Sequence, residues 1–511
     1  MADYLRRLAT TGFAYTGASV LSKLIAVALL PLYTSYVDPD QYGIAEILFV
    51  AVVALSIVVR LGVIEALLRF YYLPGEKPER VVSTGFAVLL GTASLGALVV
   101  LPFAEPISRA VLDQSEPGLI RIAIAGLWLL TLYEYLVTLF RLDERAKAYL
   151  GFSVAHTLLA IALTVALVVF DDRQAEGILL GAYLSALPFV AWLLWSERRR
   201  LFAGLDRDLL RRMLRFGLPT MPAELSLYSL QFIDRLIIAR SLGLVEVGLY
   251  AIAFKCSQAI QVVIRGFQLA FPPLAYSIVD DAEARRVYAT IITAFVAFCA
   301  WLVIGMWLEA RWIVDLLASP EYFEAYRVVG LLALGSALYG IYLALVVVIG
   351  RSGRTEFNLP ATGVGMAVNV GLNLWLVPEY GIEGAGIALV ASYLVVVAMM
   401  FRYGDRLFPV PWQWRKLILI AVVATALTVG GELALPSDGI DGFLLRALAW
   451  AAFPALLWFG SLADAEEKTA LRQLADIGEL RRRVAASRAE EDERGGAVTH
   501  EVELRDEDRL G

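Results

Sequence analysis

Apolar segments of roughly twenty residues recur along the whole chain and are separated by short polar turns. A helix needs about 20 apolar residues to cross the hydrocarbon core of a bilayer. The pattern therefore predicts an all-α integral membrane protein with about fourteen transmembrane helices. We expect these helices to begin near Thr11, Gly43, Val82, Leu119, Tyr149, Gly177, Met213, Val247, Val287, Tyr326, Glu356, Glu383, Lys416 and Phe443.

The loops between the apolar segments alternate in charge. One set carries Lys and Arg, most densely between Arg198 and Arg215, whereas the other set is short and acidic. Basic loops stay on the cytoplasmic side of a membrane. We therefore predict a multi-pass protein of the inner (cytoplasmic) cell membrane with both termini in the cytoplasm. The charged tail 463–511 is expected to be partly helical and then disordered, as a solvated tail or as a partner-docking helix.

A weak internal repeat appears when the chain is shifted by 205 residues. The offset aligns Arg6 with Arg211, Gly12 with Gly217, Gly43 with Gly248 and Arg60 with Arg265. It joins spans of the same predicted orientation, which is typical of parallel repeats that hold substrate between two halves. We assign residues 1–200 and 201–403 to two pseudo-symmetric six-helix bundles, 404–462 to two additional helices and 463–511 to the tail.

The composition agrees with a membrane protein and argues against an enzyme. The 511 residues are 59% hydrophobic and 18% charged, with a mean hydropathy of +0.68, whereas about a quarter of a soluble protein is charged. Cys256 and Cys299 lie in apolar segments without metal-site spacing. We find no nucleotide-binding glycine loop, P-loop or catalytic carboxylate motif. Catalytic activity, a metal, a cofactor and a nucleic-acid partner are therefore not expected.

Two of the predicted spans carry polar residues at helical spacing. The first set is Thr220, Glu224, Tyr228, Gln231 and Arg235, and the second is Lys255, Gln258, Gln261, Arg265 and Gln268. Residues three or four apart share one helix face. Charges within a membrane are costly and usually face a bundle interior or a water-filled cavity. We therefore predict two polar stripes that line a cavity, with Tyr228, Gln231, Gln258 and Gln261 as its uncharged polar residues.

Basic residues slightly outnumber acidic ones among the predicted mid-membrane charges. The basic residues are Lys23, Arg60, Arg235, Lys255 and Arg265. A cavity rich in Lys and Arg suits an anionic substrate such as a phosphate or pyrophosphate.

The acidic residues leave two interpretations open. Glu65, Glu134 and Glu224 either bind a coupling Na⁺ or proton or neutralise nearby bases. Asp234 is equally consistent with a structural pair with Arg235 and with a coupling role. His156 is better explained as a hydrogen-bonded bundle residue than as a proton relay.

Three stretches resemble the polysaccharide-biosynthesis flippases of the multidrug/oligosaccharidyl-lipid/polysaccharide (MOP) exporter superfamily. They are GFAYTGASVLSKLIAVALLPLYTSYVDPDQYGIAEI at 12–47, FGLPTMPAELSLYSLQFIDRLIIARSLGLVEVGLYAIAFK at 216–255 and NLWLVPEYGIEGAGIALVASYL at 373–394. The resemblance covers roughly residues 5–400. It implies a fold like that of the multidrug and toxin extruders (MATE).

The resemblance also implies a function. Such proteins move a polyprenyl-(pyro)phosphate-linked oligosaccharide from the cytoplasmic to the outer leaflet by alternating access, for exopolysaccharide and other surface polysaccharides. The implied partners are the lipid-linked oligosaccharide, membrane lipids and a polysaccharide polymerase or export machinery. The family's head-group cations map here onto Lys23, Arg60, Arg235, Lys255 and Arg265.

Two other functions remain as alternatives. One is a cation-coupled multidrug extruder of the same superfamily, against which the predicted basic bias of the cavity argues. The other is a peptidoglycan-precursor flippase, whose depletion would cause lysis. A membrane glycosyltransferase or polymerase is disfavoured, because the short outer loops leave no room for a catalytic domain.

Overall fold

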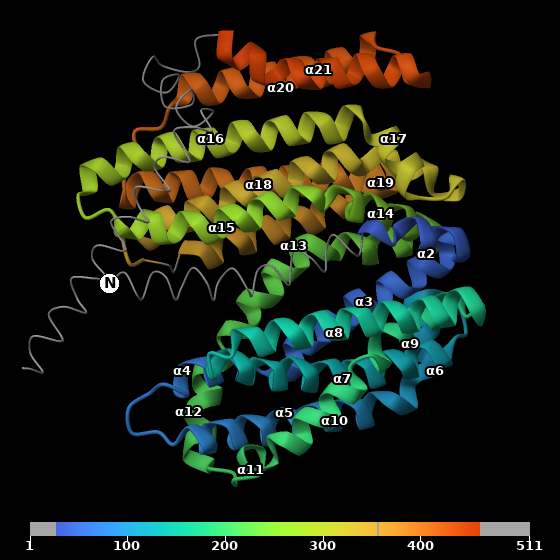
Figure 1. Ribbon diagram of the computed structural model, residues 1–511, viewed down its shortest axis with the longest axis vertical. Helices are drawn as coiled ribbons and strands as arrows, with labels where there is room; N and C mark the ends of the chain where they lie inside the picture. Colours follow the sequence, from blue (N-terminus) through green and yellow to red (C-terminus); the bar gives the residue numbers. More distant parts are fainter. Residues whose placement is uncertain (1–26, 355–356, 460–511) are drawn as a thin grey trace, which may run out of the picture.

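The computed structural model describes residues 27–354 and 357–459, and every regular element in these ranges is helical (Figure 1). The first group of elements is α2 (Leu30–Tyr36), α3 (Pro39–Arg60), α4 (Val63–Phe70), α5 (Pro78–Val100), η1 (Leu101–Phe103), α6 (Ala104–Leu112), α7 (Pro117–Leu142), α8 (Ala146–Val165), η2 (Ala166–Phe170), α9 (Gln174–Leu184), α10 (Leu187–Ser196), α11 (Arg198–Leu201) and α12 (Arg207–Gly217).

The second group of elements is α13 (Thr220–Ser241), α14 (Leu244–Ser257), α15 (Ala259–Ser277), α16 (Asp281–Leu308), α17 (Ala310–Leu317), η3 (Pro320–Ala325), α18 (Tyr326–Gly350), α19 (Asn358–Leu407), α20 (Trp414–Ala434) and α21 (Gly439–Phe459). Figure 1 shows α4 to α12 gathered in the lower part of the molecule and α14 to α21 in the upper part. Helices α3 and α13 run between the two groups. Helices α20 and α21 lie at the edge of the upper group and pack against α16.

The all-helical membrane fold is confirmed, but the count of fourteen spans is not. Ten helical segments in the described ranges are long and apolar enough to cross a membrane, or eleven if α14 and α15 count as one bent span. The first predicted span lies largely outside the described residues. Helix α13 is not among the ten, because its charged residues make it too polar.

Helix α19 accounts for two of the predicted spans. Its 50 residues would extend about 75 Å as one straight helix, more than twice the hydrocarbon thickness. Gly381 has non-helical backbone angles (φ 63°, ψ −146°) and breaks the helix. A Cβ atom at Gly384 would overlap the carbonyl oxygen of Leu376. Residues eight apart in one helix lie about 12 Å apart along its axis, so this contact shows that the chain reverses direction at Gly381.

The predicted stripe from Lys255 to Gln268 is not a single straight face. The chain bends by 47° between α14 and α15, and Gln258 lies at the break. Lys255 therefore belongs to one helical segment, whereas Gln261, Arg265 and Gln268 belong to the next. Sequence periodicity cannot reveal such a bend, because both segments keep the same spacing of polar residues.

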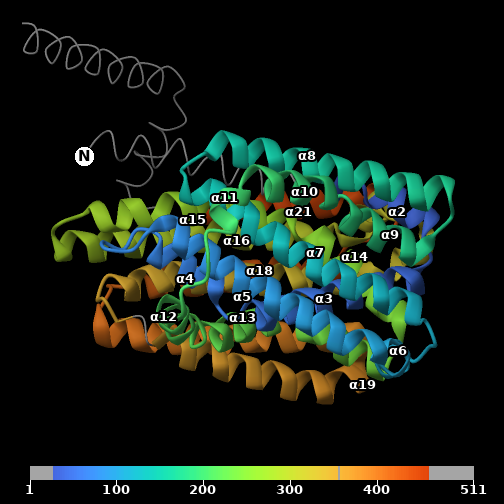
Figure 2. The same ribbon diagram turned by 90° about the horizontal axis from the view of Figure 1, so that it is seen from below.

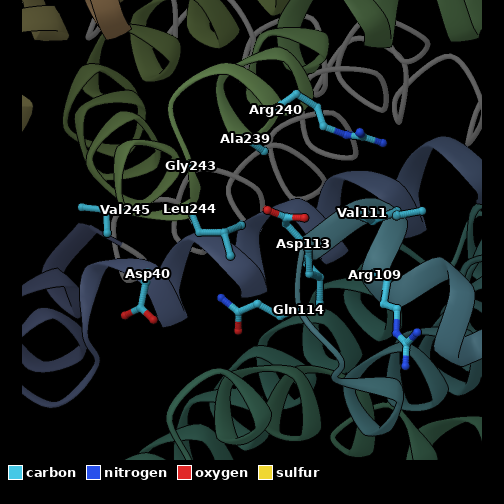
Figure 3. Close-up of a pocket in the computed structure, with 12 residues that line it drawn as sticks. Asp40, Arg109, Val111, Asp113, Gln114, Ala239, Arg240, Gly243, Leu244 and Val245 are labelled. Carbon is cyan, nitrogen blue, oxygen red and sulfur yellow. The ribbon is translucent and has the colours of Figure 1, made fainter.

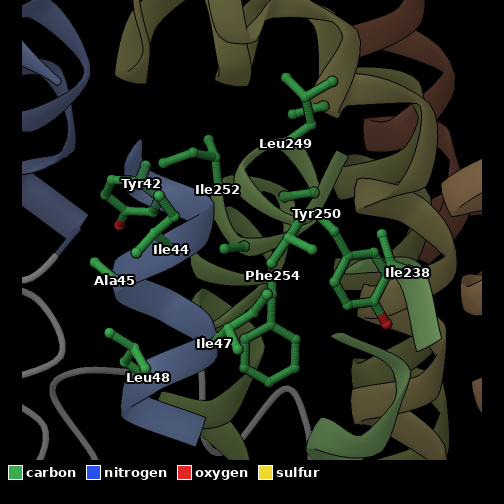
Figure 4. Close-up of a cluster of buried hydrophobic side chains, with 14 of the residues drawn as sticks. Tyr42, Ile44, Ala45, Ile47, Leu48, Ile238, Leu249, Tyr250, Ile252 and Phe254 are labelled. Carbon is green, nitrogen blue, oxygen red and sulfur yellow. The ribbon is translucent and has the colours of Figure 1, made fainter. Parts of the chain in front are cut away.

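A large apolar core joins α3 to the helices of the upper group. Ile44 and Ile47 of α3 are buried in the same cluster as Tyr250, Ile252 and Phe254 of α14 (Figure 4). Burying such side chains removes apolar surface from contact with polar surroundings, and their close packing adds dispersion energy. The core therefore fixes the relative position of α3 and α14.

Two glycines allow the backbones of α3 and α14 to touch. A Cβ atom at Gly43 would overlap the carbonyl oxygen of Leu244, and one at Gly248 would overlap that of Pro39. Gly43 and Gly248 are also the residues that the 205-residue offset aligns. The structure therefore places one repeat-related pair in direct contact.

Hydrogen bonds also join the segment before α3 to the segment around η3, at the same end of the molecule as the Gly43–Gly248 contact. Thr34 Oγ1 accepts from the Ser319 backbone N–H at 3.0 Å, and the Tyr322 hydroxyl donates to the Val37 carbonyl oxygen at 2.7 Å. We call these contacts, together with the Gly43–Gly248 contact, the seam. The seam joins residues 34–43 to residues 248–322, and it lies to the right in Figure 1.

We predict that Gly43→Val opens the seam. The added atoms would overlap backbone, and overpacking of this kind costs about 1–3 kcal/mol. Thr34 is buried, so a cysteine placed there should react slowly with a membrane-impermeant maleimide in the parent protein. In the Gly43→Val variant it should react several-fold faster.

Gly91→Val is the matched control, because a Cβ atom there has no neighbour within 4 Å. It should leave the labelling rate unchanged. Equal labelling rates in the parent, Gly43→Val and Gly91→Val proteins would contradict the role assigned to the glycine contact.

Candidate functional site

Arg60 connects three helices. It is the last residue of α3, and its Nη1 donates to Glu134 Oε2 of α7 at 2.9 Å. Its Nη2 donates to Glu224 Oε1 of α13 at 2.8 Å. We call Arg60, Glu134 and Glu224 the Arg60 site. The guanidinium binds both carboxylates through charge-assisted hydrogen bonds, which are the strong class of hydrogen bond.

The end of α3 positions this arginine. The chain leaves the helix through two left-handed residues, Leu61 (φ 51°) and Gly62 (φ 67°). The C-terminal end of a helix carries partial negative charge and favours a cation. Arg60 Nε also donates to the Ser56 carbonyl oxygen at 3.2 Å. The guanidinium is therefore held at the helix end, where it faces α7 and α13.

The Arg60 site is partly open. The Arg60 side chain is 13% exposed, but the side chains of Glu134 and Glu224 are 49% and 38% exposed. Glu65 of α4 follows five residues after Arg60 and forms no ion pair within the described ranges. Because both carboxylates are accessible, another anion can compete with them for the guanidinium.

Arg235 forms the centre of a second, closed group. Its side chain is 0% exposed, and its Nε donates to Glu46 Oε1 of α3 at 3.0 Å. Its Nη1 lies 3.3 Å from Asp234 Oδ1. The Tyr250 hydroxyl donates to the other Asp234 oxygen. A buried charge is tolerated only when it is paired and hydrogen-bonded, and here carboxylates from α3 and α13 supply the pairing.

Lys255 extends this closed group towards the seam. It donates to the Tyr42 hydroxyl, and its Nζ lies 3.9 Å from Glu46 Oε2. The Arg235 guanidinium carbon also lies 4.8 Å from the ring centroid of Phe232 and 4.4 Å from that of Phe254. Aromatic faces attract cations at such distances. We call the six polar residues Tyr42, Glu46, Asp234, Arg235, Tyr250 and Lys255 the Arg235 network.

Among the described residues, the hydrogen bonds and ion pairs of the predicted cations fall into separate groups. Arg235 and Lys255 share one network, whereas Arg60 lies in another. Arg265 is exposed and donates to Gln268 Oε1 at 3.0 Å, and among the described residues no hydrogen bond or ion pair joins it to either group. Lys23 lies outside the described residues.

The predicted uncharged residues have separate environments. Tyr228 donates to the Val50 carbonyl oxygen at 3.1 Å and stacks on Phe232. Gln258 and Gln261 are half-buried on either side of the bend between α14 and α15. Gln231 belongs to α13, but its side chain lies outside the described part of the structure.

Glu46 is the member of the Arg235 network that binds Arg235 from α3 and that sequence reasoning missed. It is one carboxylate in an otherwise apolar segment of α3, and an acidic residue in such a setting is itself a signal of an internal site. Its partner Arg235 is 189 positions away, so no local spacing connects them.

A cavity of about 380 Å³ with charged and apolar lining residues lies beside the seam (Figure 3). Its lining includes Asp40 at the start of α3, Asp113 and Gln114 after α6, and Arg240 and Leu244 around the turn between α13 and α14. Figure 3 shows Asp113 beside the Gly243–Leu244 turn. Nowhere in the described ranges do three or more His, Cys, Asp or Glu residues form a group suited to a metal ion.

The same arrangement of helices occurs in solved structures of membrane transporters and flippases. The structure superposes on the lipid II flippase MurJ in its inward closed conformation with a TM-score of 0.69 and 12% identity, covering 88% of this chain and 99% of that one. It also superposes on an inward-facing multidrug resistance MATE transporter of the MOP superfamily with a TM-score of 0.63 and 18% identity, covering 78% and 96%. At these identities the likeness shows the fold alone, and it confirms the MATE/MOP-like architecture.

The family follows from the sequence match. Residues 36–327 match the family described as "Polysaccharide biosynthesis protein", and the chain belongs to that family. It is 22% identical over 405 residues to the lipid III flippase of Escherichia coli K12, covering 75% of this chain and 95% of the relative. It is 26% identical over 333 residues to the succinoglycan biosynthesis transport protein ExoT of Rhizobium meliloti, covering 63% and 65%. These comparisons place the chain among transporters and flippases rather than enzymes.

We predict that Glu46→Gln destabilises the protein by about 3 kcal/mol, because removing one partner leaves a buried charge uncompensated. The measurement is unfolding of the purified protein in detergent, by heat or denaturant. In a double-mutant cycle, Arg235→Gln should cost much less in the Glu46→Gln background than in the parent.

Glu105→Gln removes one partner of the Glu105–Arg109 ion pair, in which the Arg109 side chain is 70% exposed. It should cause no measurable change, because exposed ion pairs contribute little. Additive effects of Glu46→Gln and Arg235→Gln would show that the network does not act as a unit.

Proposed function

We propose that this protein is a flippase that moves a lipid-linked oligosaccharide, attached through a phosphate or pyrophosphate, from the cytoplasmic to the outer leaflet for surface polysaccharide synthesis. The family assignment and the fold support this proposal. So do the names of two relatives, a lipid III flippase and a succinoglycan transport protein. The protein would reside in the inner cell membrane with both termini in the cytoplasm, and a polysaccharide polymerase or export machinery is a proposed partner.

The observation that carries the proposal is the partly exposed Arg60 site. Its guanidinium presents two donors in one plane, and phosphate oxygens accept such a pair as well as carboxylates do. Without substrate, Glu134 and Glu224 neutralise Arg60. An arriving phosphate would displace one or both carboxylates, so the site never holds an unpaired cation in a medium of low dielectric constant.

Displacement of Glu224 would also link substrate to movement. Arg60 belongs to the proposed N-terminal bundle, residues 1–200, whereas Glu224 belongs to the proposed C-terminal bundle, residues 201–403. The Arg60–Glu224 ion pair therefore crosses between the bundles. A phosphate that takes the place of Glu224 removes one contact between them, and we propose that this favours the rocking that opens the seam to the outer side.

The remaining predicted residues divide into two proposed roles. Arg235, Lys255 and Asp234 hold α3, α13 and α14 together in the closed seam. Lys23, Arg265, Tyr228, Gln231, Gln258 and Gln261 are proposed to line the path of the head group. Glu65, Glu134 and Glu224 balance Arg60, and they are also the proposed groups for coupling to Na⁺ or protons.

A cation-coupled multidrug extruder is the second candidate. It is favoured by the ratio of charges at the Arg60 site, where two half-exposed carboxylates face a single arginine. An organic cation would bind the carboxylates, whereas an anionic head group would bind the guanidinium. The two functions therefore make opposite demands on the same three side chains.

We predict that Arg60→Ala lowers the flipping of a fluorescent polyprenyl-pyrophosphate disaccharide in proteoliposomes by at least about tenfold. Hydrogen bonds to charged groups contribute roughly 1.5–3 kcal/mol, and 1.4 kcal/mol corresponds to a factor of ten. The readout is protection of the sugar from an external modifying enzyme. Arg60→Lys should retain part of the activity.

Arg286→Ala removes an exposed arginine near the start of α16 and should leave flipping unchanged. Equal flipping by parent and Arg60→Ala proteins would exclude the proposed head-group site.

We predict that the double variant Glu134→Gln/Glu224→Gln binds the disaccharide lipid at least as tightly as the parent protein does, because two competitors for Arg60 lose their charge. The measurement is retention of the fluorescent lipid by purified protein. Transport of dye cations by the parent and its loss in this variant would instead identify a multidrug extruder. Lysis on depletion in cells would indicate a peptidoglycan-precursor flippase.

A further inference from the structure

Helix α12 runs across the direction of the spanning helices. In Figure 1 it lies crosswise to α5 and α7, and Figure 2 shows it nearly end-on. Asp206 caps its start, where the carboxylate accepts from the backbone N–H groups of Asp208 and Leu209 at 3.1 and 3.0 Å. These bonds lower the pKa of Asp206. Helix α12 is therefore a regular helix with a capped N-terminus, and it lies in the connection between α10 and α13.

The surface of α12 divides into four rows at four-residue spacing, one of which holds Asp208, Arg212 and Phe216. Leu209, Met213 and Gly217 are buried against the protein. Arg207, Arg211 and Arg215 form an exposed row. Leu210, Leu214 and Leu218 lie between these rows; the first two are half-buried, and Leu218, directly after the helix, is exposed. A crosswise helix with a basic row beside an apolar row is typical of helices that lie in the membrane interface.

The arginines of the exposed row differ from their neighbours in having no ion-pair partner among residues 27–354 and 357–459. Arg212 pairs with Glu76 at 2.5 Å, and Arg200 pairs with Asp143 at 2.8 Å. Burial alone raises the pKa of Asp143, but the Arg200 and Tyr71 hydrogen bonds lower it overall. By contrast, no ion pair within the described ranges involves Arg199, Arg207, Arg211 or Arg215, and Asp208 is the one exposed acidic residue on α12.

Two exposed aromatic side chains flank these arginines. Trp195 at the end of α10 is 66% exposed, and Phe202 just after α11 is 67% exposed. The Arg198 guanidinium carbon lies 5.1 Å from the centroid of the Trp195 ring. Tryptophan and arginine at the ends of membrane helices mark the depth of the head-group layer. We call the exposed residues Trp195, Arg198, Arg199, Phe202, Arg207, Arg211 and Arg215 the linker patch.

We propose that the linker patch binds the phosphate head groups of anionic phospholipids in the leaflet at that end of the bundle. The patch lies where the spanning helices end, so its exposed arginines meet the head-group layer. Anionic lipids attract basic segments close to the membrane surface. Leu214, Leu218 and the two aromatic side chains would enter the acyl boundary beside the arginines.

Such binding would anchor the connection between the two halves. The end of α12 touches the turn after α3, because a Cβ atom at Gly62 would overlap the Gly217 carbonyl oxygen. A lipid that holds α12 in the interface therefore also holds the turn that follows Arg60. The proposal does not depend on the identity of any transported substrate.

The test uses the full chain in detergent micelles, with phosphatidylglycerol or phosphatidylcholine added in steps. Phosphatidylglycerol should raise the melting temperature of the parent protein more than phosphatidylcholine does, and high salt should remove the difference. In the variant R207Q/R211Q/R215Q this difference should fall to half or less. Native mass spectrometry should show fewer phosphatidylglycerol molecules retained by the variant than by the parent.

The matched control is R402Q/R406Q/R415Q, which removes three exposed arginines from the upper group of helices and should keep the parent's lipid preference. Equal preference in the parent and in R207Q/R211Q/R215Q would overturn the proposal.

The acidic run Glu490–Glu493 of the tail is the competing occupant. The substitutions E490Q/E491Q/D492N/E493Q are therefore made both in the parent and in R207Q/R211Q/R215Q, and the melting temperature is measured in phosphatidylcholine. If they lower the melting temperature in the parent but not in R207Q/R211Q/R215Q, the tail occupies the patch and the proposal is overturned.

Discussion

The fully buried Arg235 sets the constraint on which the arrangement of α3, α13 and α14 depends. A guanidinium cannot lose its proton under ordinary conditions, so its charge must be balanced wherever it is buried. Glu46 of α3 and Asp234 of α13 provide that balance, and the Tyr250 hydroxyl of α14 donates a hydrogen bond to Asp234. These contacts bring three helices to one point, and the close approach of Gly43 and Gly248 extends the contact to the seam.

The amino-acid sequence predicted the class of fold and the helices that carry internal charge, because both depend on local hydrophobicity and helical spacing. It singled out Arg60, Glu134 and Glu224, which the structure joins. It did not predict their pairing, because Arg60 and Glu224 are 164 positions apart. It also missed the role of Glu46 and the bend between α14 and α15, which depend on packing between distant segments.

The two charged groups differ in a way that suits different tasks. The centre of the Arg235 network, Arg235 and Asp234, is closed to solvent, and aromatic rings surround the Arg235 guanidinium, so these ion pairs stabilise one arrangement of the helices. The Arg60 site uses the same types of side chain, but its carboxylates are exposed and can be displaced. A transporter needs both kinds of contact, because one holds the closed state and the other lets a ligand change it. The glycine-mediated seam is the element whose opening this account requires.

Pulsed electron paramagnetic resonance across the seam tests the central claim most directly. Spin labels at Ser35 and Glu321, which are exposed and line one cavity beside the seam, would report the distance between the two sides in proteoliposomes. We predict one short distance without substrate and a second, longer distance when a polyprenyl-pyrophosphate saccharide is added. An unchanged short distance with that lipid, or a longer distance produced by dye cations instead, would contradict a flippase that opens this seam.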